Sequence, residues 1–160
     1  MKNTFPAIGS FVIAALLAAA SAGAQAEPKL VPLDLSKASA SFPVIMQAPE
    51  GVTAADDFGN ILVKKGANFQ VEIGSSPKDM ESLKKEIKAN TLNRLKSFLV
   101  ETPAALLYES TLMGKSEFHF AANVKAGGTT FGAEDTKGPV YARADAELML
   151  KCFQTLTAKK

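Results

Sequence analysis

Apolar and polar residues alternate most clearly over residues 69–73, which read FQVEI. The three apolar side chains must share one face and the two polar ones the other, because successive side chains of a strand point to opposite sides. The runs 42–47 and 61–63 are also apolar, and turn-forming residues follow each of them, so both predict strands. Residues 61–73 together predict a β-hairpin.

A second apolar pattern, with helical spacing, extends from residue 77 to residue 102. Its apolar positions lie three, four or eight residues apart, and Thr91 stands at the missing step: Met80, Leu83, Ile87, Leu95 and Phe98. Ser76 is the expected N-cap, Pro77 suits the first helical position, and Pro103 disfavours helical geometry just before it. The pattern predicts a helix of about six turns.

Three more strands and a closing helix are predicted in the C-terminal half. The strands cover residues 104–112, 117–124 and 129–131. In the second of them Phe118 and Phe120 lie on the apolar face and His119 lies on the polar face. The last helix is predicted over 142–157, and its apolar stripe consists of Leu148, Met149, Cys152, Phe153 and Leu156.

The order of these elements predicts the α+β class. We expect an antiparallel sheet of about five to seven strands, flanked by a long helix and a C-terminal helix in a layered sandwich. Residues 42–160 form the predicted single domain. Residues 27–41 are predicted to be an extended N-terminal arm, with Leu33 and Leu35 against the sheet.

The first 26 residues have the pattern of a signal peptide. Lys2 gives a positive start, residues 7–24 are small or apolar without charge, and Ala24-Gln25-Ala26 forms an A-x-A cleavage pattern. The alternative is an uncleaved membrane anchor, since about 20 apolar residues can span a bilayer. The run is mostly alanine, however, and no basic cluster follows it. We therefore expect removal of residues 1–26, a periplasmic or secreted protein, and no membrane span after cleavage.

Composition limits the partners and the source of stability. The 18 Lys and Arg nearly balance the 16 Asp and Glu, so net charge gives no electrostatic case for binding nucleic acid or an anionic membrane surface. Cys152 is the only cysteine, which excludes an internal disulfide, and we expect it to be a small buried hydrophobe. Stability must then come from packing.

Few residues offer reactive chemistry. His119 is the single histidine, and its position on the polar face of a strand predicts an ordinary surface residue. Two pairs of adjacent acids in predicted loops are candidates for binding a cation or for acid/base chemistry: Asp56 with Asp57, and Glu134 with Asp135. Neither pair has the spacing of a calcium-binding loop. Beyond these four candidates we predict no catalytic residue, no metal site and no cofactor.

The succession of elements resembles the PsbP-like superfamily, whose fold is shared by a Ran-binding nuclear import factor. The resemblance rests on residues 42–47 with the turn Pro49-Glu50-Gly51, residues 69–73, the helix from Pro77, and residues 141–149. Family members often carry tryptophan after the P-x-G turn, where this chain has Val52. The resemblance implies an antiparallel sheet between helices and a non-catalytic role in binding or assembly. It transfers no functional residue.

Three functions follow as hypotheses. The first is a non-catalytic binding or assembly module with a protein partner in the cell envelope. The second is a carrier of an apolar small molecule in an internal cavity, suggested by the phenylalanine-rich strands. The third is an enzyme that uses the four loop carboxylates.

Overall fold

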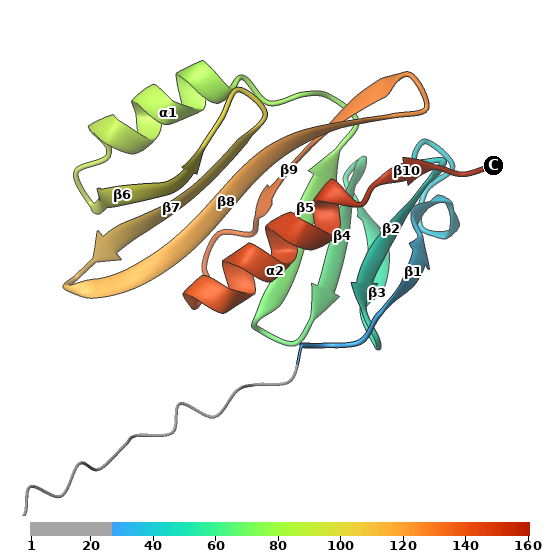
Figure 1. Ribbon diagram of the computed structural model, residues 1–160, viewed down its shortest axis with the longest axis horizontal. Coiled ribbons are helices and arrows are strands. Elements are labelled where there is room, and N and C mark those ends of the chain that lie inside the picture. The colour runs from blue at the N-terminus through green and yellow to red at the C-terminus, as the bar shows by residue number, and fades with distance from the viewer. Residues whose placement is uncertain (1–26) are drawn as a thin grey trace, which may run out of the picture.

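The computed structural model describes residues 27–160 (Figure 1), and the predicted signal peptide lies outside the described residues. The described chain is mostly antiparallel β-structure with two α-helices, as the α+β class requires. The larger sheet has seven strands in the order β3 (Thr53–Asp57), β4 (Asn60–Lys65), β5 (Phe69–Gly74), β9 (Thr129–Asp135), β8 (Lys115–Ala126), β7 (Ala105–Leu112) and β6 (Asn93–Glu101). The smaller sheet consists of β1 (Leu30–Asp34), β2 (Val44–Pro49) and β10 (Thr157–Ala158).

Helices α1 (Met80–Ala89) and α2 (Arg143–Gln154) cover opposite faces of the large sheet. Leu106 of β7 packs with α1, whereas its neighbour Leu107 belongs to the core that contains α2. Adjacent residues of a strand point to opposite faces, so the two helices lie on opposite sides. In Figure 1, α2 lies between the small sheet and the long strand β8, while α1 lies over β6 and β7.

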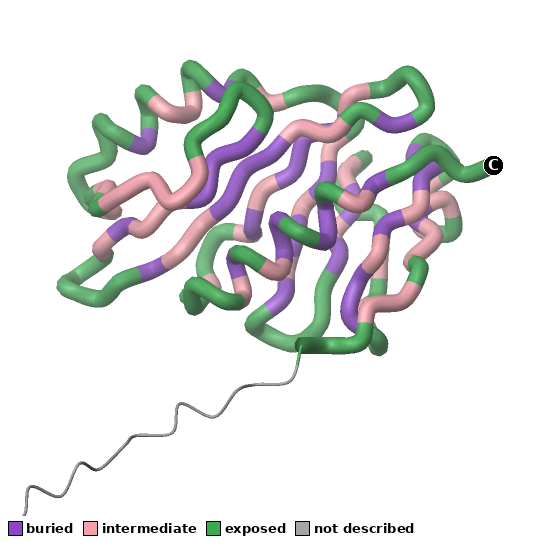
Figure 2. The backbone as a smooth tube through the Cα atoms, viewed as in Figure 1, coloured by how far each residue is buried: buried purple, intermediate pink, exposed green. Residues whose placement is uncertain are grey.

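The main core lies where α2, the small sheet and the large sheet meet, and the buried segments of Figure 2 converge there. Its largest fully buried side chains are aromatic: Phe42, Phe120, Phe131, Tyr141 and Phe153. Cys152 is buried among them, as predicted. Burying each such side chain stabilises the fold by about 2–3 kcal/mol relative to leaving it exposed.

The helix predicted over 77–102 is wrong, because α1 has only ten residues and the edge strand β6 follows it. The helix begins after Asp79, whose Oδ1 accepts a hydrogen bond from the Ser82 amide at 3.1 Å, so Asp79 rather than Ser76 is the N-cap. It ends at Asn90, whose Oδ1 accepts from the second and third following amides at 3.0 and 2.9 Å. An asparagine that binds its own downstream backbone favours a turn over continued helix.

Bulges explain why β6 has helical spacing in the sequence. Its pairing with β7 is shifted between Leu95 and Ser97 and again between Phe98 and Val100. A bulge adds one residue to a strand, so residues on the same face become three apart instead of two. Leu95 and Phe98 both pack on the α1 side of the sheet and therefore continue the apolar stripe of α1.

The segment predicted as an extended arm contains a paired strand. β1 pairs antiparallel with β2, and the short 3-10 helix η1 (Leu35–Lys37) follows it. Leu35 is completely buried, and Leu33 is half-buried against the main core. Lys159 Nζ, near the C-terminus, binds Asp34 Oδ2 at 2.7 Å, which fastens the last residues to the end of β1.

Candidate functional site

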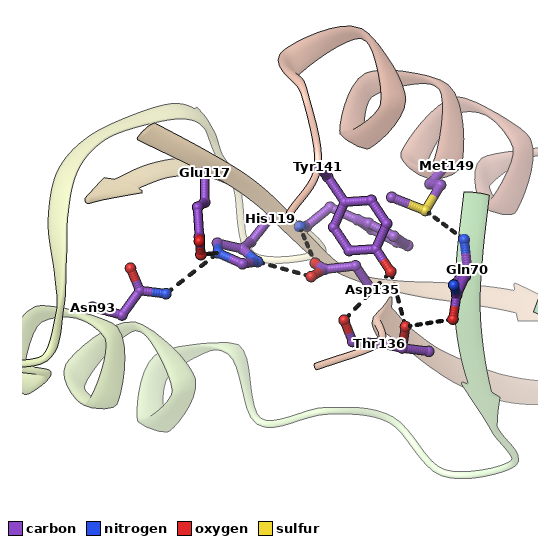
Figure 3. A network of polar contacts seen from close by, with 9 residues as sticks. Gln70, Asn93, Glu117, His119, Asp135, Thr136, Tyr141 and Met149 are labelled. Atoms are coloured by element: carbon purple, nitrogen blue, oxygen red, sulfur yellow. Dashed lines mark hydrogen bonds and ion pairs between the residues drawn. The ribbon is translucent and has the colours of Figure 1, made fainter. Parts of the chain in front are cut away.

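Buried charged side chains gather around His119 of β8 (Figure 3). His119 Nδ1 lies 2.8 Å from Asp135 Oδ2, and His119 Nε2 lies 3.6 Å from Glu117 Oε2. Only 14% of the His119 side chain is exposed, and Glu117 and Asp135 are more deeply buried. The expectation of an ordinary surface histidine is therefore wrong.

Asp135 reaches the histidine because β9 ends while β8 continues. The two strands are paired only as far as Glu134, so the next part of β8 has no neighbouring strand on that side. Asp135 Oδ1 accepts a hydrogen bond from the Phe120 amide at 2.7 Å, and the Tyr141 carbonyl accepts one from the Phe118 amide at 3.2 Å. A side chain and a loop carbonyl thus replace the missing strand.

The two strands beyond β8 complete the surroundings of the imidazole. Tyr108 of β7 is the register partner of His119, and the two ring centroids are 5.2 Å apart. Asn93 of β6 reaches across β7, so that its Nδ2 lies 3.4 Å from His119 Nε2. Four adjacent strands therefore contribute to one group of side chains, here called the His119 cluster. Ser110 of β7 is the register partner of Glu117 and completes the group. The members of the cluster are Asn93, Tyr108, Ser110, Glu117, His119 and Asp135.

The neighbouring carboxylates favour a charged imidazole. Burial alone would lower the pKa of His119, but the hydrogen bond and charge of Asp135, followed by those of Glu117, outweigh burial and raise this pKa above its usual 6.5. Burial raises the pKa of the Tyr108 phenol, and the charges of Asp135 and Glu134 raise it further. Tyr108 therefore stays neutral and packs against the imidazole as an aromatic ring.

Two buried oxygens of the cluster, Asn93 Oδ1 and Ser110 Oγ, have no hydrogen-bond partner. Buried polar atoms in proteins are nearly always paired, so this end of the cluster can still form hydrogen bonds. A half turn of the Asn93 amide would present Oδ1 to His119 Nε2. A doubly protonated ring requires such an acceptor, because both of its nitrogens are donors. The side chains can therefore adapt to protonation of the histidine.

The arrangement orients an imidazole and does not enclose a metal. Asp135 and Glu117 lie against opposite nitrogens of the ring, so their oxygens do not converge on one point. Within residues 27–160, no three or more His, Cys, Asp or Glu are grouped so that they could hold a metal ion. Pairing of Nδ1 with an aspartate also orients the general base of hydrolases. In this protein the other nitrogen, Nε2, faces the side chains of Glu117 and Asn93. The only hydroxyl-bearing aliphatic side chain of the cluster, Ser110, is buried.

The four acidic residues that the sequence offered as candidates do not lie together in the structure. Asp56 and Asp57 end strand β3, and Glu134 and Asp135 end strand β9, so the prediction that these pairs lie in loops is wrong. Strands β4 and β5 lie between β3 and β9, so the two pairs are separated by about 14 Å across the sheet. Glu134 forms an ion pair of 3.0 Å with Lys78. Of the four, only Asp135 joins the His119 cluster.

A polar chain continues from the end of β9 toward α2 (Figure 3). Thr136 Oγ1 lies 2.8 Å from the Tyr141 hydroxyl and donates to Gln70 Oε1 at 3.2 Å. The backbone N–H of Gln70 donates a hydrogen bond to Met149 Sδ, with 3.3 Å between nitrogen and sulfur. These contacts fix the start of β5 against α2, beside a surface pocket.

This pocket, here called the α2 pocket, has a volume of about 590 Å³ and lies where α2 approaches β1 and β5. Its apolar side chains come from segments far apart in the sequence: Pro28, Leu30, Pro49, Phe69, Ala144 and Leu148. Its charged side chains are Glu27, Lys65, Asp145, Glu147 and Lys151. Lys151 Nζ lies 3.6 Å from Glu27 Oε1, so two of these charges pair at the pocket. The carrier hypothesis placed its ligand in an internal cavity, whereas this pocket opens on the surface and its residues were not predicted as a site.

Comparisons with known proteins leave the family open. No protein-family model, curated protein or solved structure matches the chain. The resemblance to the PsbP-like superfamily therefore remains a prediction. As for membrane spans, none of the helices between residues 27 and 160 has both the length and the apolar character that crossing a bilayer needs.

Proposed function

We propose that the protein is an exported, non-catalytic binding module of the periplasm or the cell exterior, and that its α2 pocket receives an apolar group of an envelope protein. The pocket is the observation that carries this proposal. It combines apolar side chains of β1, β5 and α2 with charged side chains of both signs. A surface of that composition binds through apolar contact, and its charges orient the bound group.

The polar chain beside the pocket supports a preformed site. Gln70 is held by Thr136 and by Met149, and it directly follows Phe69 of the pocket. Leu148 of the pocket belongs to α2, which is anchored in the main core by Met149 and Cys152. A pocket on such rigid elements loses little conformational entropy when it is filled.

The pocket volume favours a second candidate function, the carriage of an apolar small molecule. Ligand pockets typically measure about 300–1,000 Å³. The α2 pocket, at about 590 Å³, lies within that range. Its charged side chains of opposite sign select no particular ligand charge, so a neutral apolar body is the chemistry that fits best.

The proposed non-catalytic role agrees with the resemblance to the PsbP-like superfamily and with the geometry of the ionisable groups. Strands β4 and β5 lie between Asp56 and Glu134, and two carboxylates flank His119. An acid/base pair would need its two members on one reacting group, within hydrogen-bond reach. Enzyme action by the four acidic candidates is therefore not part of the proposal.

The test compares Leu148→Glu with the matched variant Val140→Glu in an envelope pull-down and in native mass spectrometry. Leu148 lines the pocket, whereas Val140 is an exposed apolar residue just before α2 and does not line it. We expect Leu148→Glu to lose a partner protein or a bound mass that the wild type and Val140→Glu both retain. Equal retention by both variants, with unchanged thermal unfolding, would contradict the proposal.

A further inference from the structure

Two hairpin turns of the large sheet hold a bulky apolar residue in a left-handed conformation. Met113 has φ +50° and precedes Gly114, and Phe58 has φ +51° and precedes Gly59. Both turns have two residues, which requires positive φ values that asparagine, aspartate or glycine adopt most easily. The β8–β9 hairpin follows that rule with Gly127 and Gly128.

Both apolar side chains are also fully in solvent. Met113 is 94% exposed and Phe58 is 103% exposed. Neither side chain packs against the fold, so the backbone strain is not offset by packing within the chain. Strain that persists without an internal benefit commonly marks a functional contact.

Met113 belongs to an apolar end of the molecule. Asn93 is the register partner of Leu112, so the preceding residue, Leu92, lies beside the β7–β8 turn. Figures 1 and 2 show the α1–β6 loop and the β7–β8 turn as neighbouring exposed loops at one end of the large sheet. Leu92, Leu112 and Met113 are all exposed apolar residues, and we call them the Met113 patch.

Two cations flank the Met113 patch. Arg94 follows Leu92 by two residues, and Lys115 is the register partner of Leu112. Neither of them forms an ion pair with any acidic residue of the described chain. The nearby Glu109 is already bound by Lys96, so it does not neutralise them.

The Phe58 turn has the opposite charge pattern. Asp56 and Asp57 immediately precede Phe58 on β3. The two turns therefore share their length, their backbone strain and their exposed apolar residue, but they differ in the sign of the neighbouring charge. This difference makes the Phe58 turn an internal control for the Met113 patch.

We propose that the Met113 patch, with Arg94 and Lys115, docks the protein on an anionic lipid surface. Three apolar side chains at the end of a sheet are fewer than a stable protein interface needs, since each partner typically buries about 800 Å². Binding to a membrane surface needs less buried protein area, because a few apolar side chains enter the lipid headgroup region while adjacent cations bind acidic headgroups. The overall charge is nearly neutral, so the electrostatic part of this binding rests on Arg94 and Lys115 alone.

The test uses vesicles of phosphatidylcholine, with or without phosphatidylglycerol, and the exported protein that remains after the expected removal of residues 1–26. The chain has no tryptophan, so Met113→Trp provides a single fluorescent reporter at the patch. We expect a blue shift and co-sedimentation with the anionic vesicles alone, and weaker binding as salt rises from about 50 mM to about 500 mM.

Three variants of this exported protein then locate the docking surface, because any contribution of the N-terminus is common to all of them. Met113→Ser should lower vesicle affinity at least about fivefold, and Arg94→Gln with Lys115→Gln should lower it about fivefold per removed cation. Phe58→Ser should leave vesicle affinity unchanged. Thermal unfolding of each variant shows that the fold is retained.

Each remaining outcome would overturn the proposal. One is a wild type that does not sediment with anionic vesicles at low salt, and another is a loss with Phe58→Ser equal to that with Met113→Ser. A third is crosslinking from position 113 to an envelope protein without any lipid binding, which would assign the patch to a protein partner. Vesicle binding does not depend on the α2 pocket, so Leu148→Glu should bind vesicles like the wild type.

Discussion

Asp135 binds His119 through a 2.8 Å hydrogen bond between Oδ2 and Nδ1, while its other oxygen accepts the Phe120 amide at 2.7 Å. One carboxylate thus closes the unpaired part of β8 and also orients the imidazole beside it. Because both contacts use the same side chain, protonation of the histidine is coupled to the backbone of this unpaired part of β8. The energetic consequences of this coupling can be measured.

The first prediction concerns the pH dependence of stability. The neighbouring carboxylates raise the pKa of His119 in the folded state above 6.5. A raised folded-state pKa means that the folded protein binds the proton more tightly than the unfolded chain. Its stabilising contribution is therefore complete below about pH 6.5 and is lost as the pH rises through the folded-state pKa. We expect the midpoint of urea unfolding to fall over that range.

His119 is the only histidine, so NMR titration of the untagged protein reports its pKa directly. The variant His119→Gln separates its contribution from that of other groups, because the additional pH dependence of the wild type must disappear. A measured pKa below 6.5 would contradict this account of the cluster.

The second prediction compares two adjacent carboxylates at the end of β9. Asp135→Asn removes the charge that faces His119 but retains an oxygen for the Phe120 amide, and we expect a loss of about 2–3 kcal/mol in unfolding free energy. Glu134→Gln removes a partly exposed ion pair with Lys78, and we expect a loss below about 1 kcal/mol. Urea unfolding measures both losses. Equal losses of unfolding free energy would show that the buried pair of Asp135 and His119 stabilises the fold no more than the pair of Glu134 and Lys78.

Asp135→Asn has a second readout. Removing the negative charge should lower the pKa of His119 in the NMR titration, whereas Glu134→Gln should change it much less. A purely steric role of Asp135 would destabilise the protein without moving that pKa.

The third prediction concerns the single thiol. Burial raises the pKa of Cys152 to about 11, so little thiolate is present at neutral pH and solvent reaches it poorly. We expect a maleimide to label the native protein slowly at pH 8 and the urea-unfolded protein within minutes. Rapid labelling of the native protein would place Cys152 outside the core.

Sequence patterns correctly predicted those strands and helices that bury one regular apolar face in the core. The alternation in β5 and β8 and the stripe of α2 all appear in the main core. The patterns failed at β6, where bulges give Leu95 and Phe98 a spacing of three that also fits a helix. Asn90, whose side chain ends α1, was the local signal that could have corrected the prediction.

The His119 cluster was only partly accessible from sequence. Glu117 and His119 are two residues apart on one strand, so their shared face could be inferred. Asp135 could not be placed beside them, because its contact depends on β9 ending one residue beyond its pairing with β8. Asn93 was assigned to a helix and was therefore missed. The α2 pocket joins four distant segments, which no local pattern reveals.

The fourth prediction tests the strain at the two apolar turns. Asparagine adopts positive φ more easily than methionine or phenylalanine, so Met113→Asn and Phe58→Asn should each stabilise the fold by about 0.5–1 kcal/mol in urea unfolding. Leu92→Asn is the matched control, since Leu92 is exposed but has no positive φ. If the two turn variants gain no more than this control, the turns are not strained. If they do gain, both residues lower the stability of the fold, and for Met113 the proposed lipid contact is the benefit that offsets this loss.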